Sequence, residues 1–204
     1  MQFVTIEKHD RIAIVRFDRG IAANPMSQQL LRELTEAAHS FDDDSHTSAV
    51  ILTGRSDHFS MGADLKDPQT AALREAGLAE RRLGMMAGMR MCRAWEEIQA
   101  LTITAIEGWC VGGVALAVAT DLRILGASAG MYVPEIERGM NMSWGSVPRI
   151  TNLVGPARAK RIVILAEKIM AERAVDWGFA DETVADGKAV TAAWAMAERA
   201  ATLP

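Results

Sequence analysis

The chain has 204 residues, of which 50% are hydrophobic and 24% are charged, and its formal net charge at pH 7 is −4. This length allows one domain with a sizeable core, and the slightly acidic balance gives no reason to expect a nucleic acid or an anionic membrane as a partner. No stretch approaches the roughly 20 apolar residues that cross a bilayer, and the N-terminus lacks the features of a secretory signal. We therefore expect a cytoplasmic protein.

The first elements expected along the chain are a β-hairpin and an amphipathic helix. Residues 3–7 alternate between apolar and polar side chains, and residues 12–17 are apolar and rich in β-branched types. Two such runs with a short turn between them predict a hairpin. Ser27 can then cap a helix whose apolar face has helical spacing and comprises Leu30, Leu31, Leu34 and Ala38.

The middle of the chain predicts buried strands alternating with helices. Residues 49–54 and 103–106 are short, continuous apolar runs, which are typical of fully buried strands. The polar, methionine-rich segment between them is predicted to be helical, with Met85, Met89 and Cys92 on one face. A third strand is expected at 122–125, and further helices over 114–119, 156–168, 171–177 and 188–201. This order predicts an α/β fold.

Two glycine-bearing turns follow the first two buried strands, at residues 59–65 and 108–113. Such turns expose successive backbone N–H groups, and a helix N-terminus adds about half a positive charge. Two of them side by side can direct two donors at one developing oxyanion, and each donor contributes roughly 3–4 kcal/mol in a transition state. The alternative is that the glycines only permit tight turns and close helix packing.

These segments, taken in order, resemble the signatures of the enoyl-CoA hydratase/isomerase (crotonase) family. Residues 50–54 with 59–65 resemble the first signature, and residues 103–113 with 120–123 resemble the second. Later landmarks are Pro134-Glu135-Ile136 with Gly139, Pro148-Arg149 with Gly155, and Ala171-Glu172-Arg173-Ala174 with Trp177-Gly178. The resemblance implies one crotonase-like domain over residues 1–204, an α/β spiral of ββα units. It also implies that the C-terminal helical portion from about residue 156 is incomplete and that the usual helical extension is truncated.

The resemblance also implies site roles, with an acyl-CoA thioester as substrate and no cofactor apart from the CoA of that substrate. Ala63 N–H would be one oxyanion donor, and Gly112 or Gly113 would supply the second. Glu135 would be the catalytic acid/base, and an apolar pocket would favour its neutral form. The residues implied in CoA binding are Asn24, Met61, Asp64 and Leu65.

The chain departs from the family pattern at its second signature. Many members carry a second glutamate after the glycine turn, where this chain reads Val114-Ala115-Leu116-Ala117. The turn itself has two glycines where relatives often have three, and Thr102 replaces a common proline. One carboxylate fits an isomerase-like proton shift more easily than hydration. The alternatives are acyl-CoA decarboxylation, thioester hydrolysis, or a catalytically impaired CoA-binding paralogue. By resemblance we expect a trimer-based homo-oligomer.

The sequence lacks the patterns typical of metal sites, of serine hydrolases and of phosphate-binding loops. No metal site is predicted, because the histidines show no ligand spacing, and neither a G-x-S-x-G elbow nor a phosphate-binding glycine loop occurs. Cys92 and Cys110 are expected to be reduced, buried thiols. Trp109 and Trp144 are expected in the core or in a pocket wall. The four histidines that lack ligand spacing are His9, His39, His46 and His58.

Overall fold

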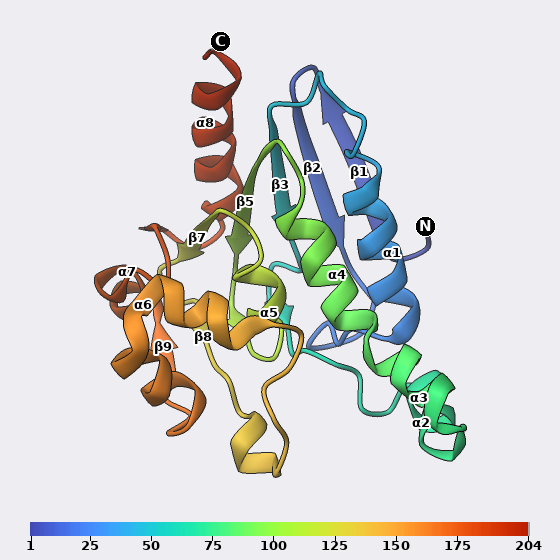
Figure 1. Ribbon diagram of the computed structural model, residues 1–204. Coiled ribbons are helices and arrows are strands. Elements are labelled where there is room, and N and C mark those ends of the chain that lie inside the picture. Colours follow the sequence, from blue (N-terminus) through green and yellow to red (C-terminus); the bar gives the residue numbers. More distant parts are fainter. Residues whose placement is uncertain (204) are drawn as a thin grey trace.

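The computed structural model describes residues 1–203 and contains two β-sheets with helices around them (Figure 1). The predicted hairpin is confirmed as β1 (Val4–His9) paired antiparallel with β2 (Ile12–Phe17). The larger sheet continues in parallel through β3 (Ala49–Thr53), β5 (Leu101–Ile106), β7 (Leu122–Gly126) and β10 (Glu182–Val184). The predicted buried strands are therefore neighbours in one sheet.

A smaller sheet has the order β4-β6-β8-β9. Its strands are β4 (His58–Ser60), β6 (Trp109–Cys110), β8 (Gly130–Met131) and β9 (Ile169–Met170). β4, β6 and β8 each follow one strand of the larger sheet along the chain, and helical segments come after each pair. This repetition confirms the predicted spiral of ββα units. Strands of two or three residues are too short for periodicity to reveal.

Helices cover both faces of the larger sheet. α1 (Gln28–His39) is capped as predicted, because Ser27 Oγ accepts a hydrogen bond from Leu30 N at 3.2 Å. Figure 1 shows α1 beside α4 (Ala87–Glu96), and the Trp95 indole N–H of α4 donates to Leu34 O of α1 at 3.0 Å. On the opposite face lies α8 (Ala189–Ala201), whose buried residues are Ala189, Ala193 and Ala197. Small side chains four residues apart let α8 lie close to the strands.

The predicted helical stretch between β4 and β5 consists of three helices. These are α2 (Pro68–Glu75), α3 (Leu78–Met85) and α4, and the first two project from the end of α4 in Figure 1. The predicted common face of Met85, Met89 and Cys92 is wrong. Met85 is 70% exposed and Met89 44% exposed, whereas Cys92 is buried. The chain breaks at Met86, so Met85 belongs to a different helix from the other two.

The later helices differ from prediction mainly in their bounds. α5 (Val114–Ala117) is shorter than expected, whereas α7 (Ala171–Trp177) and α8 agree with the sequence pattern. α6 (Ser146–Val163) starts ten residues before the predicted start at 156 and bends at Gly155, where φ is +76°. Pro156 follows the bend and cannot donate a helical hydrogen bond, which accounts for the break. Within residues 1–203, no helix is both long and apolar enough to span a membrane.

Candidate active site

The turns after β4 and β6 meet at two glycines. Gly62 has a φ of +85°, and a Cβ atom built on it would lie 2.6 Å from Gly112 Cα. A Cβ atom on Gly112 would lie 3.1 Å from Gly62 Cα. Only glycine combines the left-handed conformation with so close a backbone approach. The two turns, about 50 residues apart in the sequence, are therefore in direct backbone contact.

Free backbone donors lie at this junction. Ala63 and Gly112 line one pocket. In residues 1–203, neither Ala63 N–H nor Gly112 N–H has an acceptor in the protein, whereas the neighbouring Gly62 N–H donates to Ser60 Oγ at 3.0 Å. Gly113 N–H, the other candidate donor, also has no acceptor within residues 1–203, but Gly113 is buried against Ser60 and does not line the pocket. The arrangement offers two free donors to a bound oxygen atom.

Glu135 stands beside the second turn. It begins a 3₁₀ helix, η1 (Glu135–Arg138), and its Oε1 atom would lie 3.3 Å from a Cβ atom at Gly112. Its Oε2 atom is buried and has no hydrogen-bond partner in residues 1–203. Burial raises the pKa of Glu135, although its own backbone N–H and the charge of Arg138 act in the opposite direction. A carboxyl group with a raised pKa and a free oxygen is suited to accept and return a proton.

The pocket between the glycine turns and residues 134–144 has a volume of about 110 Å³. Within the part of the chain that the structure describes, Glu135 is its only lining carboxylate. Ala115 of α5 also lines it, in the stretch where the sequence lacks the second glutamate. The remaining polar side chains of the lining are Arg138, Asn141 and Ser143.

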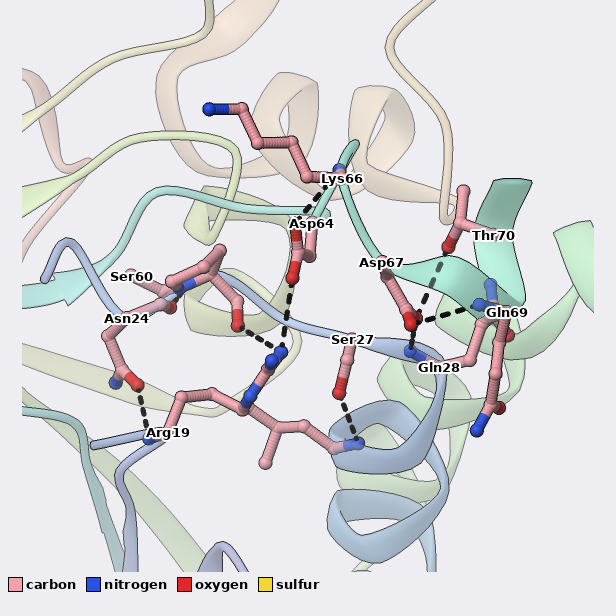
Figure 2. Close-up of polar contacts among 12 residues, drawn as sticks. Arg19, Asn24, Ser27, Gln28, Ser60, Asp64, Lys66, Asp67, Gln69 and Thr70 are labelled. Carbon is pink, nitrogen blue, oxygen red and sulfur yellow. Dashed lines mark hydrogen bonds and ion pairs between the residues drawn. The ribbon is translucent and has the colours of Figure 1, made fainter. Parts of the chain in front are cut away.

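Asn24 lies beneath the first turn and not in the pocket lining. It has no exposed surface. Its side-chain amide N–H groups donate to Phe17 O at 3.1 Å and to Phe59 O at 3.0 Å. Its Oδ1 accepts a hydrogen bond from Arg19 N at 2.9 Å, which Figure 2 shows. Both ends of the amide are thus occupied by the protein itself. The Asn24 side chain therefore supports the first turn from beneath, and a contact of Asn24 with CoA stays a prediction.

Of the other residues predicted to bind CoA, Met61 and Leu65 line the pocket, and Leu65 is 44% exposed. Asp64 does not line it. The Asp64 carboxylate points to Arg19, with 3.4 Å between Oδ2 and Nη1, and its Oδ1 accepts from Lys66 N at 3.0 Å (Figure 2). The first turn therefore presents only apolar residues to the pocket, whereas the Asp64 carboxylate accepts hydrogen bonds from the surrounding chain.

A polar network ties the first turn to α1 and α2. Asp67 is buried, and its Oδ2 accepts from Gln28 N at 2.7 Å, while its Oδ1 accepts from Gln69 N at 3.1 Å (Figure 2). One carboxylate therefore caps α2 and also binds the start of α1. Asp67 carries no signal of this double role in the sequence beyond a helix-cap pattern before Pro68.

Most residues of the opposite wall of the pocket were not predicted from the sequence. Met140, Asn141, Met142 and Ser143 line it together with Trp144, which the sequence did suggest as a wall residue. Residues 139–144 form neither helix nor strand, so no periodicity marks them.

Cys92 and Cys110 are free and buried as predicted, and burial raises the pKa of Cys92 to about 12. Residues 1–203 contain no cluster of three potential metal ligands among His, Cys, Asp and Glu.

The sequence and the fold are similar to those of known proteins. A family model described as enoyl-CoA hydratase/isomerase matches residues 7–204. The chain is 30% identical to the crotonyl-CoA hydratase of Syntrophomonas wolfei, over 89% of this chain and 68% of that protein. It is 28% identical to the short-chain-enoyl-CoA hydratase of Clostridium acetobutylicum, over 96% and 74%. A solved enoyl-CoA hydratase structure from Bacillus anthracis superposes with a TM-score of 0.90 at 26% identity, covering 99% of this chain and 78% of that one.

Proposed function

The chain belongs to the enoyl-CoA hydratase/isomerase family, and we propose that it transfers a proton on an enoyl-CoA thioester held between its two glycine turns. The thioester oxygen would accept hydrogen bonds from Ala63 N–H and Gly112 N–H. The support for this pair is that both residues line one pocket and neither N–H group has a partner within residues 1–203. We favour Gly112 over Gly113 because Gly113 is outside the lining.

The observation that carries the proposal is the position of Glu135, beside Gly112 and with one buried oxygen free of hydrogen bonds. In the proposed step, the Glu135 carboxylate removes a proton from the carbon next to the thioester carbonyl. The electron pair of the broken C–H bond moves onto the carbonyl oxygen, where the two N–H groups stabilise the negative charge. Glu135 then returns the proton to another carbon of the conjugated system, which shifts the double bond.

A double-bond shift needs one acid/base group, whereas hydration also needs a group that activates water. Glu135 is the only carboxylate in the described lining, and Ala115 leaves the α5 side without a second one. We therefore propose isomerisation as the preferred reaction, although the two curated relatives are named hydratases. Met61 and Leu65 are proposed to contact the substrate, and Asn24 and Asp64 to support the turn. The homo-oligomer, the cytoplasmic location and the lack of a separate cofactor stay predictions.

Glu135→Gln tests the proposal, with Glu137→Gln as a matched control. Glu137 is exposed on the same 3₁₀ helix and accepts a hydrogen bond from Tyr132 Oη. Glu135→Gln should lower kcat by roughly 10²–10⁴-fold and leave the Kd for acyl-CoA nearly unchanged, because only the proton-transfer group is lost. Glu137→Gln should behave as wild type.

The measurements are turnover of a β,γ-enoyl-CoA and of crotonyl-CoA, together with deuterium exchange at the carbon next to the carbonyl, followed by NMR. Exchange reports proton removal whichever product forms. Wild-type exchange in Glu135→Gln would remove Glu135 from the mechanism. Conversion of crotonyl-CoA to its hydrate without any double-bond shift would establish hydration in place of isomerisation.

A further inference from the structure

A second, apolar hollow lies next to the catalytic pocket and has a volume of about 330 Å³. Its far side is formed by α3 and α4, and its near side by Ser143 and Trp144. Ser143 and Trp144 also line the catalytic pocket. One short segment of chain thus separates the two hollows. We call the second one the methionine groove, after Met85, Met86 and Met89, which line it together with Leu78, Arg81 and Arg82. The surface that these residues expose to the groove is mostly apolar.

The Trp144 side chain is seated on a glycine of α4. A Cβ atom at Gly88 would lie 2.0 Å from Trp144 Cε2 and 2.2 Å from Nε1. Any side chain at position 88 would therefore displace the indole. Gly88 lies in the first turn of α4, and its lack of a side chain leaves room for the indole. The Trp144 ring therefore packs directly against the backbone of α4.

The backbone at Trp144 is also held from α4. Trp144 has a φ of +59°, a conformation that few residues other than glycine adopt, and Gly145 follows with φ of +70°. Trp144 O accepts a hydrogen bond from Arg149 Nη1 at 3.0 Å, and Arg149 Nε donates to Glu96 Oε1 of α4 at 2.9 Å. Strained residues persist where the surrounding structure determines them, commonly at ligand sites. The indole is thus fixed both through its ring and through its backbone.

We propose that the Trp144 indole is the end wall of the acyl pocket and restricts the substrate to short acyl groups. The catalytic pocket on one side of the wall has about a third of the volume of the groove on the other. The groove is lined by flexible methionines, which adapt to apolar chains of different shape. Removing the indole joins the hollows and admits longer apolar chains. This inference rests on the proposed function in taking an acyl-CoA as the ligand.

The test compares the binding of saturated acyl-CoAs by calorimetry, because saturated thioesters bind without turnover. The series is butanoyl-, hexanoyl-, octanoyl- and decanoyl-CoA, with wild type, Trp144→Ala and the control Trp194→Ala. Trp194 packs edge-on against His9, with ring centroids 5.3 Å apart, and does not line either hollow. In wild type, the affinity for acyl-CoA should rise with acyl-chain length only among the short chains and then stay level. In Trp144→Ala it should rise by about four-fold per added methylene, the equivalent of about 0.8 kcal/mol.

Two further variants keep the test decisive if Trp144→Ala folds poorly. Trp144→Leu retains an apolar side chain but shortens the wall, and it should shift the profile in the same direction by a smaller amount. Adding Met89→Trp to either variant refills the groove and should restore the wild-type preference.

An unchanged chain-length profile in both Trp144 variants would overturn the inference while leaving the proposed function intact. A wild-type affinity that already rises through decanoyl-CoA would do the same. If wild type binds none of the acyl-CoAs, the proposed function and this inference both fail.

Discussion

The two sides of the proposed catalytic pocket are built in different ways. The glycine-turn side presents backbone N–H groups and is held by buried side-chain hydrogen bonds, such as Ser60 Oγ to Asn24 O at 2.8 Å. The opposite side, residues 134–144, presents side chains from a 3₁₀ helix and an irregular segment. A backbone group stays when a side chain is replaced. The N–H groups of the first side are therefore insensitive to side-chain replacement, whereas replacements on the second side would change the proposed acid/base group and the proposed acyl specificity.

The largest effect is expected from Gly62→Ala, which separates the two turns. The substitution forces an alanine into φ of +85° and places its Cβ atom 2.6 Å from Gly112 Cα. The left-handed conformation and the overpacking together should lower the free energy of unfolding by roughly 2–5 kcal/mol. Displacement of the donors should lower kcat by about 10²-fold or more. Urea unfolding and turnover measure the two effects.

Gly187→Ala is the control for backbone strain alone. Gly187 has φ of +77°, but nothing lies within 4 Å of a Cβ atom built there. Gly187→Ala should lower the free energy of unfolding by only about 1–2 kcal/mol and leave kcat unchanged. Equal losses in the two variants would show that the contact between the turns has no role in stability or catalysis.

Asn24→Ala should have the next largest effect and tests whether the first side is held from beneath. The variant leaves Arg19 N–H and the carbonyl groups of Phe17 and Phe59 without their partner, which should cost at least about 2 kcal/mol of unfolding free energy. Asn24 has a φ of +46°, so alanine at this position adds backbone strain to the loss of the hydrogen bonds. Asn24→Gly removes the same hydrogen bonds without that strain. A tenfold higher Kd for acyl-CoA with unchanged stability would instead return Asn24 to the predicted role in CoA binding.

The sequence predicted the first side well because its signals are local. Buried strands appear as continuous apolar runs, Ser27 marks the start of α1, and the glycines mark turns that no other residue tolerates. The direct contact of Gly62 with Gly112 could be expected only from the family resemblance, since no local pattern shows which turns meet in space. The same resemblance assigned Asn24 to CoA, although burial and hydrogen bonding direct its amide into the protein.

The second side was harder to predict because its residues follow no period. Glu135 alone was predicted there as functional, and only through the resemblance. Trp144 was expected in a core or a wall, yet its position between two hollows depends on Gly88, which is 56 residues away in the sequence and lies in α4. The predicted methionine face was wrong because Met85 ends α3, whereas Met89 and Cys92 lie in α4, so one helical period does not run through all three residues.

The smallest expected effect concerns the stability cost of Glu135, the proposed acid/base. Burial raises the pKa of Glu135 in the folded protein above its ordinary value of 4.5. Between the unfolded and the folded pKa, the folded state binds more protons than the unfolded state, so stability falls as pH rises through this window. The penalty is absent below the unfolded pKa and complete above the folded one.

Glu135→Gln cannot titrate and should therefore raise the thermal midpoint relative to wild type at about pH 8 but not at about pH 4, where the wild-type carboxyl group is neutral. Glu137→Gln provides the baseline for loss of a charge on the same 3₁₀ helix. Higher stability together with lost turnover is the pattern of a residue kept for function at a cost in stability. The opposite sign, a lower midpoint for Glu135→Gln at about pH 8, would mean that the carboxylate makes a net stabilising interaction there, for example with Arg138. Glu135 would then have a structural role, and the second side of the pocket would lose its proposed acid/base group.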